Sequence, residues 1–293
     1  MAALLSFAES RSRSPDGVEI GVRIGGAGTE TPLLLVAPPG ARVEVFGRVA
    51  GHLGARRRVA SWDLRGTFGS AEVGARREIG LAAHVADAER ALDVAGLDTA
   101  AIVSWSLGAE IALELAFTRP ARVSALVLLS PVLGETFART LGLPRATPLR
   151  RASLALRRAG PVGSRLRARI SAWPGSEAWA RRLGLAAETL DSEAWRALGE
   201  RVHELDLVAA DRLVQSLERA PATGALADVG APALVVAGDA DRYGGGLAAR
   251  RLARALPLGE LFTVKEATHL AHLEFPELVQ LRIERFLAER APR

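Results

Sequence analysis

The sequence predicts an α/β protein in which a mostly parallel, twisted β-sheet carries helices on both faces. Three observations lead to this fold class. Continuous apolar runs recur along the chain, as buried parallel strands require. Helical patterns separate these runs, and strands that alternate with helices favour a parallel sheet. The alternation stops after Pro131 and resumes only at Ala233, which indicates an insertion.

The expected strands begin with a hairpin. Asp16-Gly17 is a turn signal, and alternating apolar residues from Val18 to Ile24 follow it, so the start of the chain predicts an antiparallel pair. The later strands are continuous apolar runs that predict burial on both faces of the sheet. They lie at residues 33–36, 59–62, 101–104, 126–130, 233–237 and 261–264.

Helical patterns fill the intervals between these strands. They lie at residues 43–53, 81–95, 107–117, 247–256 and 277–289. Residues 134–222 show only helical or loop patterns, punctuated by prolines. We therefore predict one core domain, residues 1–133 and 223–293, interrupted by a helical cap insertion at 134–222.

Composition narrows the class of protein. The 293 residues, 49% of them hydrophobic, can form one large α/β domain with an insertion. The sequence contains no cysteine, which excludes disulfides, a thiolate nucleophile and cysteine-ligated metals. Five scattered histidines show no metal-ligand spacing, so we expect neither a metal nor another cofactor. No apolar run approaches the ~18 residues of a transmembrane segment, and no signal peptide is evident, so we expect a soluble, cytoplasmic protein.

Almost all of the positive charge of the chain is carried by arginine. The formal net charge is +5, and Lys265 is the only lysine. The simplest interpretation of this preference for arginine is GC-rich coding bias. No zinc-finger spacing, aromatic RNA-binding motif or helix-turn-helix pattern accompanies the positive charge. We therefore expect no nucleic-acid partner.

The clearest chemical signal is Ser106, which lies where an apolar strand meets a run of helix formers. A strand that ends at a serine and continues as a helix makes a sharp turn, and the turn projects the hydroxyl away from the sheet. The segment Ser104-Trp105-Ser106-Leu107-Gly108 is similar to the Gly-x-Ser-x-Gly nucleophile elbow, with Ser104 in place of the first glycine. Ser106 is therefore the predicted nucleophile.

A serine nucleophile needs a base and a group that orients the base. His269 and Asp241 each follow a predicted strand, where an open α/β sheet places its reactive groups. Asp239 is the alternative acid, with a role in bracing its loop if Asp241 is the acid. His272 is the alternative base, and its other predicted roles are to line the site or to bond a loop.

Three further segments match one family, in order along the chain. Residues 63–70, Asp-Leu-Arg-Gly-Thr-Phe-Gly-Ser, resemble that family's Asp-x-Arg-Gly-x-Gly-x-Ser stretch with one extra residue. Residues 238–241, Gly-Asp-Ala-Asp, resemble its Gly-Glu-x-Asp segment, which ends on the triad acid. Residues 269–277 are similar to its final stretch, which begins with the catalytic histidine and ends in Pro-Glu. Together with the order Ser…Asp…His, these segments make the sequence resemble the α/β-hydrolase fold superfamily.

This resemblance implies a fold and a reaction. The fold is an eight-stranded α/β-hydrolase sheet with a helical cap, and the catalytic residues are Ser106, Asp241 and His269. Dehalogenases and aspartate-type epoxide hydrolases are disfavoured, because those relatives have aspartate at the position of Ser106.

Acyl transfer also requires hydrogen-bond donors for the oxyanion. One predicted donor is the backbone N–H of Leu107, directly after the nucleophile. The second should come from the loop after the strand at 33–36. Pro38 and Pro39 have no N–H, so only Gly40 or Ala41 can supply it.

Arginines gather in the predicted cap. Residues 139–182 contain eleven arginines and a single acid, Glu177. The eleven are Arg139, Arg145, Arg150, Arg151, Arg157, Arg158, Arg165, Arg167, Arg169, Arg181 and Arg182. One interpretation is a docking surface for an anionic partner, such as a carboxylate, a phosphopantetheine-bearing carrier, a CoA-linked substrate or an acidic membrane surface. The other is a solvated helical face.

Aromatic residues suggest where an apolar substrate would bind. Trp173, Trp179 and Trp195 either line a substrate pocket or form the core of the cap itself. Trp105, next to the nucleophile, and His272 are further predicted substrate contacts.

These observations predict a cofactor-independent serine hydrolase. We expect it to cleave a carboxylic ester or thioester of a small molecule with an apolar part, through an acyl-enzyme on Ser106. The alternatives are other chemistry on the same fold, namely C–C bond hydrolysis, lactone opening, acyl transfer or haloperoxidase-like perhydrolysis. A ligand-binding protein with little turnover is the third hypothesis.

Overall fold

The computed structural model describes most of the chain. The described residues are 5–71, 73, 79–135, 138, 141–142, 151–152, 155–156, 159–171, 173–200, 205–219 and 225–291. Among them, none of the helices combines the length and the apolar character that crossing a bilayer would require.

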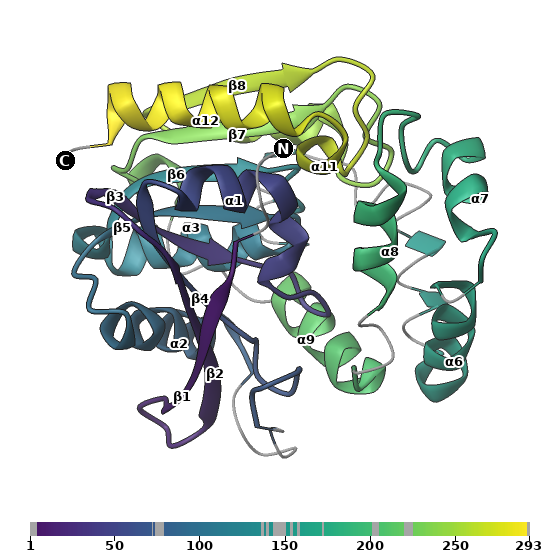
Figure 1. Cartoon of the computed structure of the whole chain (residues 1–293), viewed down its shortest axis with the longest axis horizontal. Coiled ribbons are helices and arrows are strands. Elements are labelled where there is room, and N and C mark those ends of the chain that lie inside the picture. The colour runs from purple at the N-terminus through teal and green to yellow at the C-terminus, as the bar shows by residue number, and fades with distance from the viewer. Residues whose placement is uncertain are drawn as a thin grey trace.

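Eight strands form one sheet in the order β1-β2-β4-β3-β5-β6-β7-β8 (Figure 1). The strands are β1 (Phe7–Arg13), β2 (Glu19–Gly26), β3 (Glu30–Val36), β4 (Arg57–Trp62), β5 (Ala100–Trp105), β6 (Val123–Leu129), β7 (Ala233–Gly238) and β8 (Gly259–Val264). The predicted hairpin is confirmed, since β1 pairs with β2 in antiparallel register. The β2–β4 pair is also antiparallel, and every remaining pair is parallel. The predicted fold class is therefore confirmed.

Helices cover both faces of the sheet because alternate side chains of each strand point in opposite directions. In β3, Leu34 and Val36 join one buried apolar layer, and Leu33 and Leu35 join the other. The first layer packs against α2 (Leu81–Val94), α3 (Gly108–Thr118) and α10 (Gly246–Ala255). The second packs against α1 (Gly47–Gly54), α11 (Ala271–Glu274) and α12 (Pro276–Arg290).

One predicted helix is divided in the structure. The sequence predicts a continuous helix over residues 43–53, but a 3₁₀ turn, η1 (Val43–Phe46), precedes α1. Gly47, with φ of 51°, separates the two pieces. Glycine adopts this left-handed backbone region without steric cost, so the chain changes direction there. Two shorter 3₁₀ turns, η2 (Pro120–Arg122) and η4 (Leu226–Asp228), precede β6 and β7.

Residues 134–222, which lie between β6 and β7, are called the insertion below. The helices in its described part include α6 (Gly160–Ser171), α7 (Ser176–Arg182), α8 (Ser192–Glu200) and α9 (Leu207–Arg219). Figure 1 shows them beyond the ends at which the parallel strands terminate. Ala186 and Leu190 join one core layer, and Leu213 and Leu217 join the other. The insertion therefore packs onto the core; its assignment as a cap remains a prediction.

Candidate active site

The candidate site begins at Ser106, in the turn that joins β5 to α3. Its φ is 54°, an unusual value for a residue with a Cβ. Three backbone hydrogen bonds hold the turn. The Ser106 N–H donates to the Leu129 carbonyl over 3.0 Å, and the Ser106 carbonyl accepts from the N–H groups of Ala109 and Val132 over 3.2 and 3.1 Å. This strained and well-braced turn has the geometry expected of a nucleophile elbow.

Close packing between α3 and β3 explains why a glycine, Gly108, lies two positions after Ser106. A Cβ on Gly108 would lie 2.5 Å from the Val36 carbonyl oxygen, so α3 can begin this close to β3 only with glycine there. The position two residues before Ser106 tolerates a side chain. Ser104 occupies it and is fully buried in β5.

Three side chains from distant parts of the chain form a hydrogen-bonded line. His269 Nε2 lies 2.9 Å from Ser106 Oγ, and His269 Nδ1 lies 2.9 Å from Asp241 Oδ2. In the tautomer that satisfies both contacts, the serine hydroxyl donates to Nε2 and Nδ1–H donates to the carboxylate. The structure thus brings together the three residues that the sequence predicts as nucleophile, base and acid.

The surroundings of Asp241 keep it ionised. Its Oδ1 accepts hydrogen bonds from the N–H groups of Tyr243 at 2.8 Å and Gly244 at 2.9 Å. Burial raises the pKa of Asp241, but the His269 ring and these N–H donors outweigh burial and hold the pKa below its ordinary value. The alternative acid, Asp239, bonds elsewhere, accepting from the Glu266 N–H over 2.7 Å. It braces the loop and does not orient the histidine.

Aromatic neighbours position His269. The Trp105 indole N–H donates to the His269 carbonyl over 3.2 Å. The rings of Trp105 and Tyr243 lie 5.7 and 5.1 Å from the His269 ring, centroid to centroid. Trp105 is only 8% exposed and belongs to the buried apolar layer that packs against α1, α11 and α12. Its predicted role as a substrate contact remains a prediction.

His272 lies beneath the site. It is 1% exposed, and its Nε2 contacts the Val45 carbonyl at 3.0 Å. Burial lowers the pKa of His272 to about 4, so the ring is neutral near neutral pH. Of the roles considered for His272, the structure supports the loop bond. The predicted substrate contact is contradicted, because the buried ring packs under Trp105, 5.1 Å away.

The N–H groups of Gly40 and Ala41, the two predicted oxyanion donors in the loop after β3, differ in whether they are already hydrogen-bonded. The Ala41 N–H donates to the Pro38 carbonyl over 3.0 Å, which closes a turn. Gly40 has φ of 84°, as the third residue of a type II turn requires, and Pro39 suits the position before it. Ala41 is therefore not a free donor, which corrects that prediction, and Gly40 is the remaining candidate in this turn. Leu107 is the N-cap residue of α3, a position whose N–H has no acceptor within the helix.

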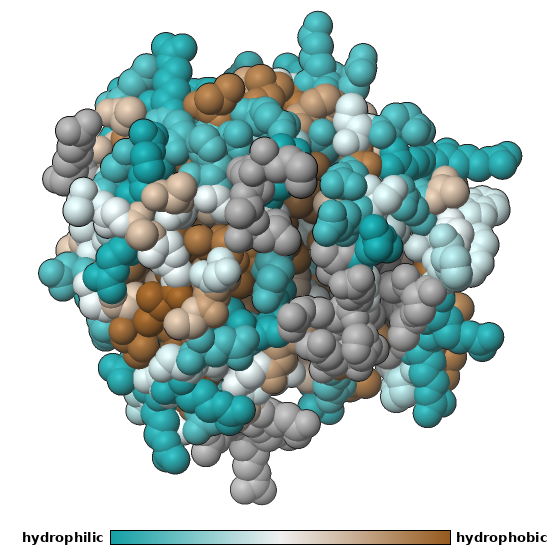
Figure 2. Space-filling view, in the orientation of Figure 1, coloured by the Kyte–Doolittle hydropathy of each residue, from teal (hydrophilic) through white to brown (hydrophobic). Residues whose placement is uncertain are grey.

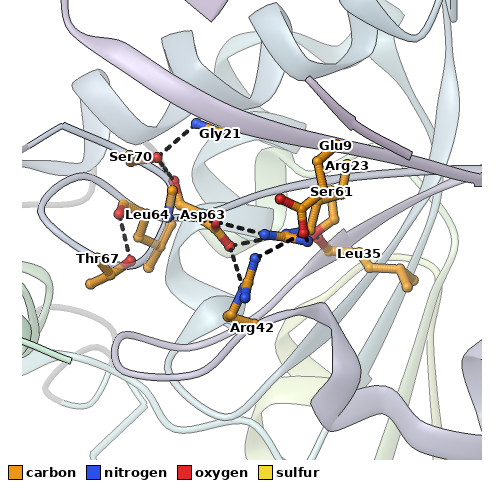
Figure 3. Close-up of polar contacts among 11 residues, drawn as sticks. Glu9, Gly21, Arg23, Leu35, Arg42, Ser61, Asp63, Leu64, Thr67 and Ser70 are labelled. Atoms are coloured by element: carbon orange, nitrogen blue, oxygen red, sulfur yellow. Dashed lines mark hydrogen bonds and ion pairs between the residues drawn. The ribbon is translucent and has the colours of Figure 1, made fainter. Parts of the chain in front are cut away.

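An ion-pair cluster anchors this loop (Figure 3). Arg42, directly after the turn, contacts Asp63 at 3.3 Å, and Arg23 contacts the same carboxylate at 3.1 Å. The Gly69 N–H donates to Asp63 over 3.0 Å. Burial raises the pKa of Asp63, and the Arg23 charge partly offsets that rise. The family-like segment at residues 63–70 thus ties the β3 loop and the β4 loop together.

Comparison with known proteins shows the family of the chain. Residues 33–279 match the model of a family described as "Alpha/beta hydrolase family". The chain belongs to the alpha/beta hydrolase family. The match spans the loops that carry Ser106, Asp241 and His269 as well as the insertion, so the whole candidate site lies within the matched residues.

Solved structures of several hydrolases share this fold. A hydrolase from Pseudomonas aeruginosa is 22% identical with a TM-score of 0.71, covering 98% of this chain and 99% of the other. An esterase from Rhodococcus sp. is 20% identical with a TM-score of 0.74, covering 97% and 99%. An E-2-(acetamidomethylene)succinate hydrolase is 19% identical with a TM-score of 0.70, covering 97% and 100%.

In this alpha/beta hydrolase family member, Glu274 is a site residue that the sequence analysis missed. It is 3% exposed and lies one short helix after His269. Its carboxylate accepts from the Thr268 N–H at 2.7 Å and the Thr268 hydroxyl at 2.6 Å. It also accepts from the Ala187 N–H in the insertion, at 2.8 Å. Glu274 therefore connects the histidine loop to the insertion.

Glu274→Gln is expected to weaken both fold and activity. An amide has one acceptor oxygen, and its NH₂ would face an N–H donor, so at least one buried donor loses its partner at a cost of about 1–3 kcal/mol. Urea unfolding would measure that loss, and ester turnover should fall because Thr268 precedes His269. Glu277→Gln is the control, since Glu277 is exposed and pairs with Arg48 at the surface. Equal effects of both substitutions would contradict the role of Glu274.

The three tryptophans of the insertion differ in their surroundings. Trp173 and Trp179 are 47% and 50% exposed, with ring centroids 6.3 Å apart. Trp195 packs against a core layer, and its indole N–H donates to Ser176 Oγ over 3.2 Å. About half of each of the Trp173 and Trp179 side chains is exposed, and their predicted role in a substrate pocket remains a prediction.

The arginines of the insertion are described in part. Arg139, Arg145, Arg150, Arg157 and Arg158 lie outside the described residues. Arg181 pairs with Glu177 at 2.8 Å, whereas Arg165 and Arg169 are exposed. Among the described residues, no group of three or more metal-ligating side chains lies together.

Proposed function

We propose that this protein is a serine hydrolase that cleaves a carboxylic ester or thioester of a small molecule with an apolar part. The observation that carries the proposal is the hydrogen-bonded line from Ser106 through His269 to Asp241, with both contacts at 2.9 Å. Such a line removes the serine proton as the oxygen attacks. The chemistry needs no cofactor.

The reaction proceeds in two halves. Ser106 Oγ attacks the carbonyl carbon while His269 Nε2 takes the hydroxyl proton, and Asp241 stabilises the resulting imidazolium. The imidazolium then gives the proton to the leaving alcohol or thiol as the bond to it breaks. Water, deprotonated by His269, attacks the acyl-enzyme, and the proton returns to Ser106 as the carboxylic acid leaves.

The oxyanion would be held by backbone donors. Leu107 at the N-cap of α3 and Gly40 in the β3 turn are the proposed pair, and each donor is worth about 2.7–4 kcal/mol of barrier. The fixed elbow and the anchored turn favour this arrangement because the donors are then in place before the substrate binds.

A second candidate is other hydrolytic chemistry on the same triad, such as C–C bond hydrolysis or lactone opening. The Pro38-Pro39 turn favours it, because two of the loop's residues have no N–H to offer an oxyanion. Acyl transfer and haloperoxidase-like perhydrolysis belong to the same group. An esterase and an E-2-(acetamidomethylene)succinate hydrolase among the similar structures are compatible with either candidate.

Covalent labelling tests the proposal. A fluorophosphonate probe should label the purified protein, and peptide mass spectrometry should place the adduct on Ser106. Short and medium p-nitrophenyl esters should be hydrolysed, together with acyl thioesters. Labelling without hydrolysis of any ester or thioester would move the conclusion to the second candidate, and absence of labelling would contradict an activated serine.

A further inference from the structure

Helix α6 exposes an apolar stripe. Val162, Leu166 and Ile170 are 71%, 48% and 51% exposed, although residues of this kind are normally buried in a folded protein. They recur every four residues, a spacing that places them on one face of a helix. Helix α6 also packs on the rest of the insertion, since Gly163 is buried and α6 contacts α9.

The stripe continues onto the next helix. Trp173 follows α6 and contacts Trp179 of α7, and both indoles are about half exposed. Leu183, just after α7, is 51% exposed. These side chains make up what is called here the α6–α7 apolar face. Its members are Val162, Leu166, Ile170, Trp173, Trp179 and Leu183.

Positive charge borders this face. Arg165 and Arg169 are exposed on α6, each one residue before a member of the stripe. The Arg182 guanidinium lies over the Trp179 ring, 5.7 Å from its centroid. The one acid between residues 160 and 182, Glu177, is engaged by Arg181 and by the Ser192 hydroxyl. The border of the face is therefore cationic.

The face lies on an accessible edge of the molecule. Figure 1 shows α6 and α7 at the outer edge of the insertion, away from the sheet. Figure 2 shows hydrophilic and hydrophobic side chains interleaved along this edge. An apolar helical face with half-exposed tryptophans and a border of arginines matches the chemistry of a lipid headgroup region. In such a region, apolar side chains of a surface helix enter the boundary between headgroups and acyl chains, and arginines pair with lipid phosphates.

We propose that the α6–α7 apolar face docks on the surface of an anionic phospholipid bilayer. Charge complementarity selects the anionic surface, because each arginine near such a surface adds attraction that a neutral bilayer lacks. The helices lie on the surface and do not span the membrane, in keeping with their length. This inference is independent of the proposed reaction, because it concerns binding and not turnover.

Vesicle co-sedimentation tests the proposal with the full chain. We expect binding to phosphatidylcholine–phosphatidylglycerol vesicles at least about tenfold tighter than to phosphatidylcholine vesicles, with a strong decrease in about 1 M salt. Arg165→Glu with Arg169→Glu should weaken binding to the anionic vesicles at least about tenfold. Leu166→Gln with Ile170→Gln should do the same by removing apolar contact.

Matched controls separate docking from general surface effects. Leu281→Gln removes an apolar side chain that is 63% exposed on α12, and Arg254→Glu reverses an exposed charge on α10. Neither should change vesicle binding. Because all six substituted side chains are exposed, circular dichroism and the urea midpoint should stay at wild-type values.

Three results would overturn the proposal. The first is equal binding to the neutral and the anionic vesicles. The second is a dimer in light scattering that Leu166→Gln with Ile170→Gln dissociates, without any vesicle binding, since the face would then join two copies of this chain. The third is displacement of the protein from vesicles by coenzyme A that binds through Arg165 and Arg169, which would make a soluble anion the partner.

Discussion

Replacing Ser106 by alanine is expected to lower kcat for ester hydrolysis by about a million-fold, to the level supplied by binding and oxyanion donors. The oxygen that forms the acyl-enzyme is lost, while the fold is kept, because alanine removes only the hydroxyl. Steady-state hydrolysis of p-nitrophenyl esters measures kcat, and fluorophosphonate labelling measures the nucleophile directly. Both signals should disappear together.

Ser104 offers a matched control for this substitution. It lies two residues earlier in β5, is fully buried, and its hydroxyl has no hydrogen-bond partner among the described residues. Ser104→Ala should therefore retain labelling and most of the turnover. If Ser106→Ala still hydrolysed esters at the wild-type rate, or if Ser104→Ala abolished labelling, the assignment of the nucleophile would be wrong.

Replacing Asp241 by asparagine is expected to lower kcat by about ten-thousand-fold at neutral pH. The asparagine NH₂ would face His269 Nδ1 and favour the tautomer that carries its proton on Nε2. That nitrogen could then no longer accept the proton of Ser106. The pH dependence of kcat/KM in wild type and variant measures the effect.

Asp239→Asn is the matched control, because Asp239 accepts a hydrogen bond from the Glu266 N–H and lies in the same loop. Asparagine can still accept that bond through its carbonyl oxygen, so turnover should change little. If Asp239→Asn lowered kcat more than Asp241→Asn, then Asp239 would be the acid that orients His269 and Asp241 the residue that braces the loop.

The lowered pKa of Asp241 also has a consequence for stability. A carboxyl whose pKa is lower in the folded than in the unfolded protein stabilises the fold above the unfolded value of about 3.9. That contribution is lost as the pH falls through the lower folded pKa. The difference in unfolding free energy between wild type and Asp241→Asn should therefore narrow between about pH 5 and the acid range below the folded pKa. Urea titrations across that range measure it.

Most elements of the fold could be predicted because their signals are local. Buried parallel strands need continuous apolar runs, and the runs at residues 33–36, 101–104 and 233–237 became β3, β5 and β7. The divided helix at residues 43–53 was not predictable from apolar periodicity. A glycine inside a helical pattern is common, and only the turn of the chain onto the sheet showed that Gly47 adopts a left-handed backbone.

The candidate site, like the fold, has features that the sequence predicts and features that only the tertiary structure reveals. Ser106, Asp241 and His269 could be predicted because each follows a strand and their order along the chain is informative. The choice of Asp241 over Asp239 required the 2.9 Å contact with His269. That Ala41 is not a free donor became clear only from the hydrogen bond between its N–H and the Pro38 carbonyl. The sequence Pro-Pro-Gly-Ala alone does not tell which N–H forms a hydrogen bond within the turn.

The sequence by itself determined the order of strands and helices, the elbow-like turn at Ser106 and the set of candidate catalytic residues, because these depend on side-chain type and spacing along the chain. The tertiary structure decided what depends on segments distant in the chain. Glu274 joins the His269 loop to Ala187, 87 residues away, and Asp63 anchors Arg42 beside the β3 turn. It also decided that the apolar residues of α6 and α7 face outward, because only packing against the rest of the insertion determines which face of a helix is buried.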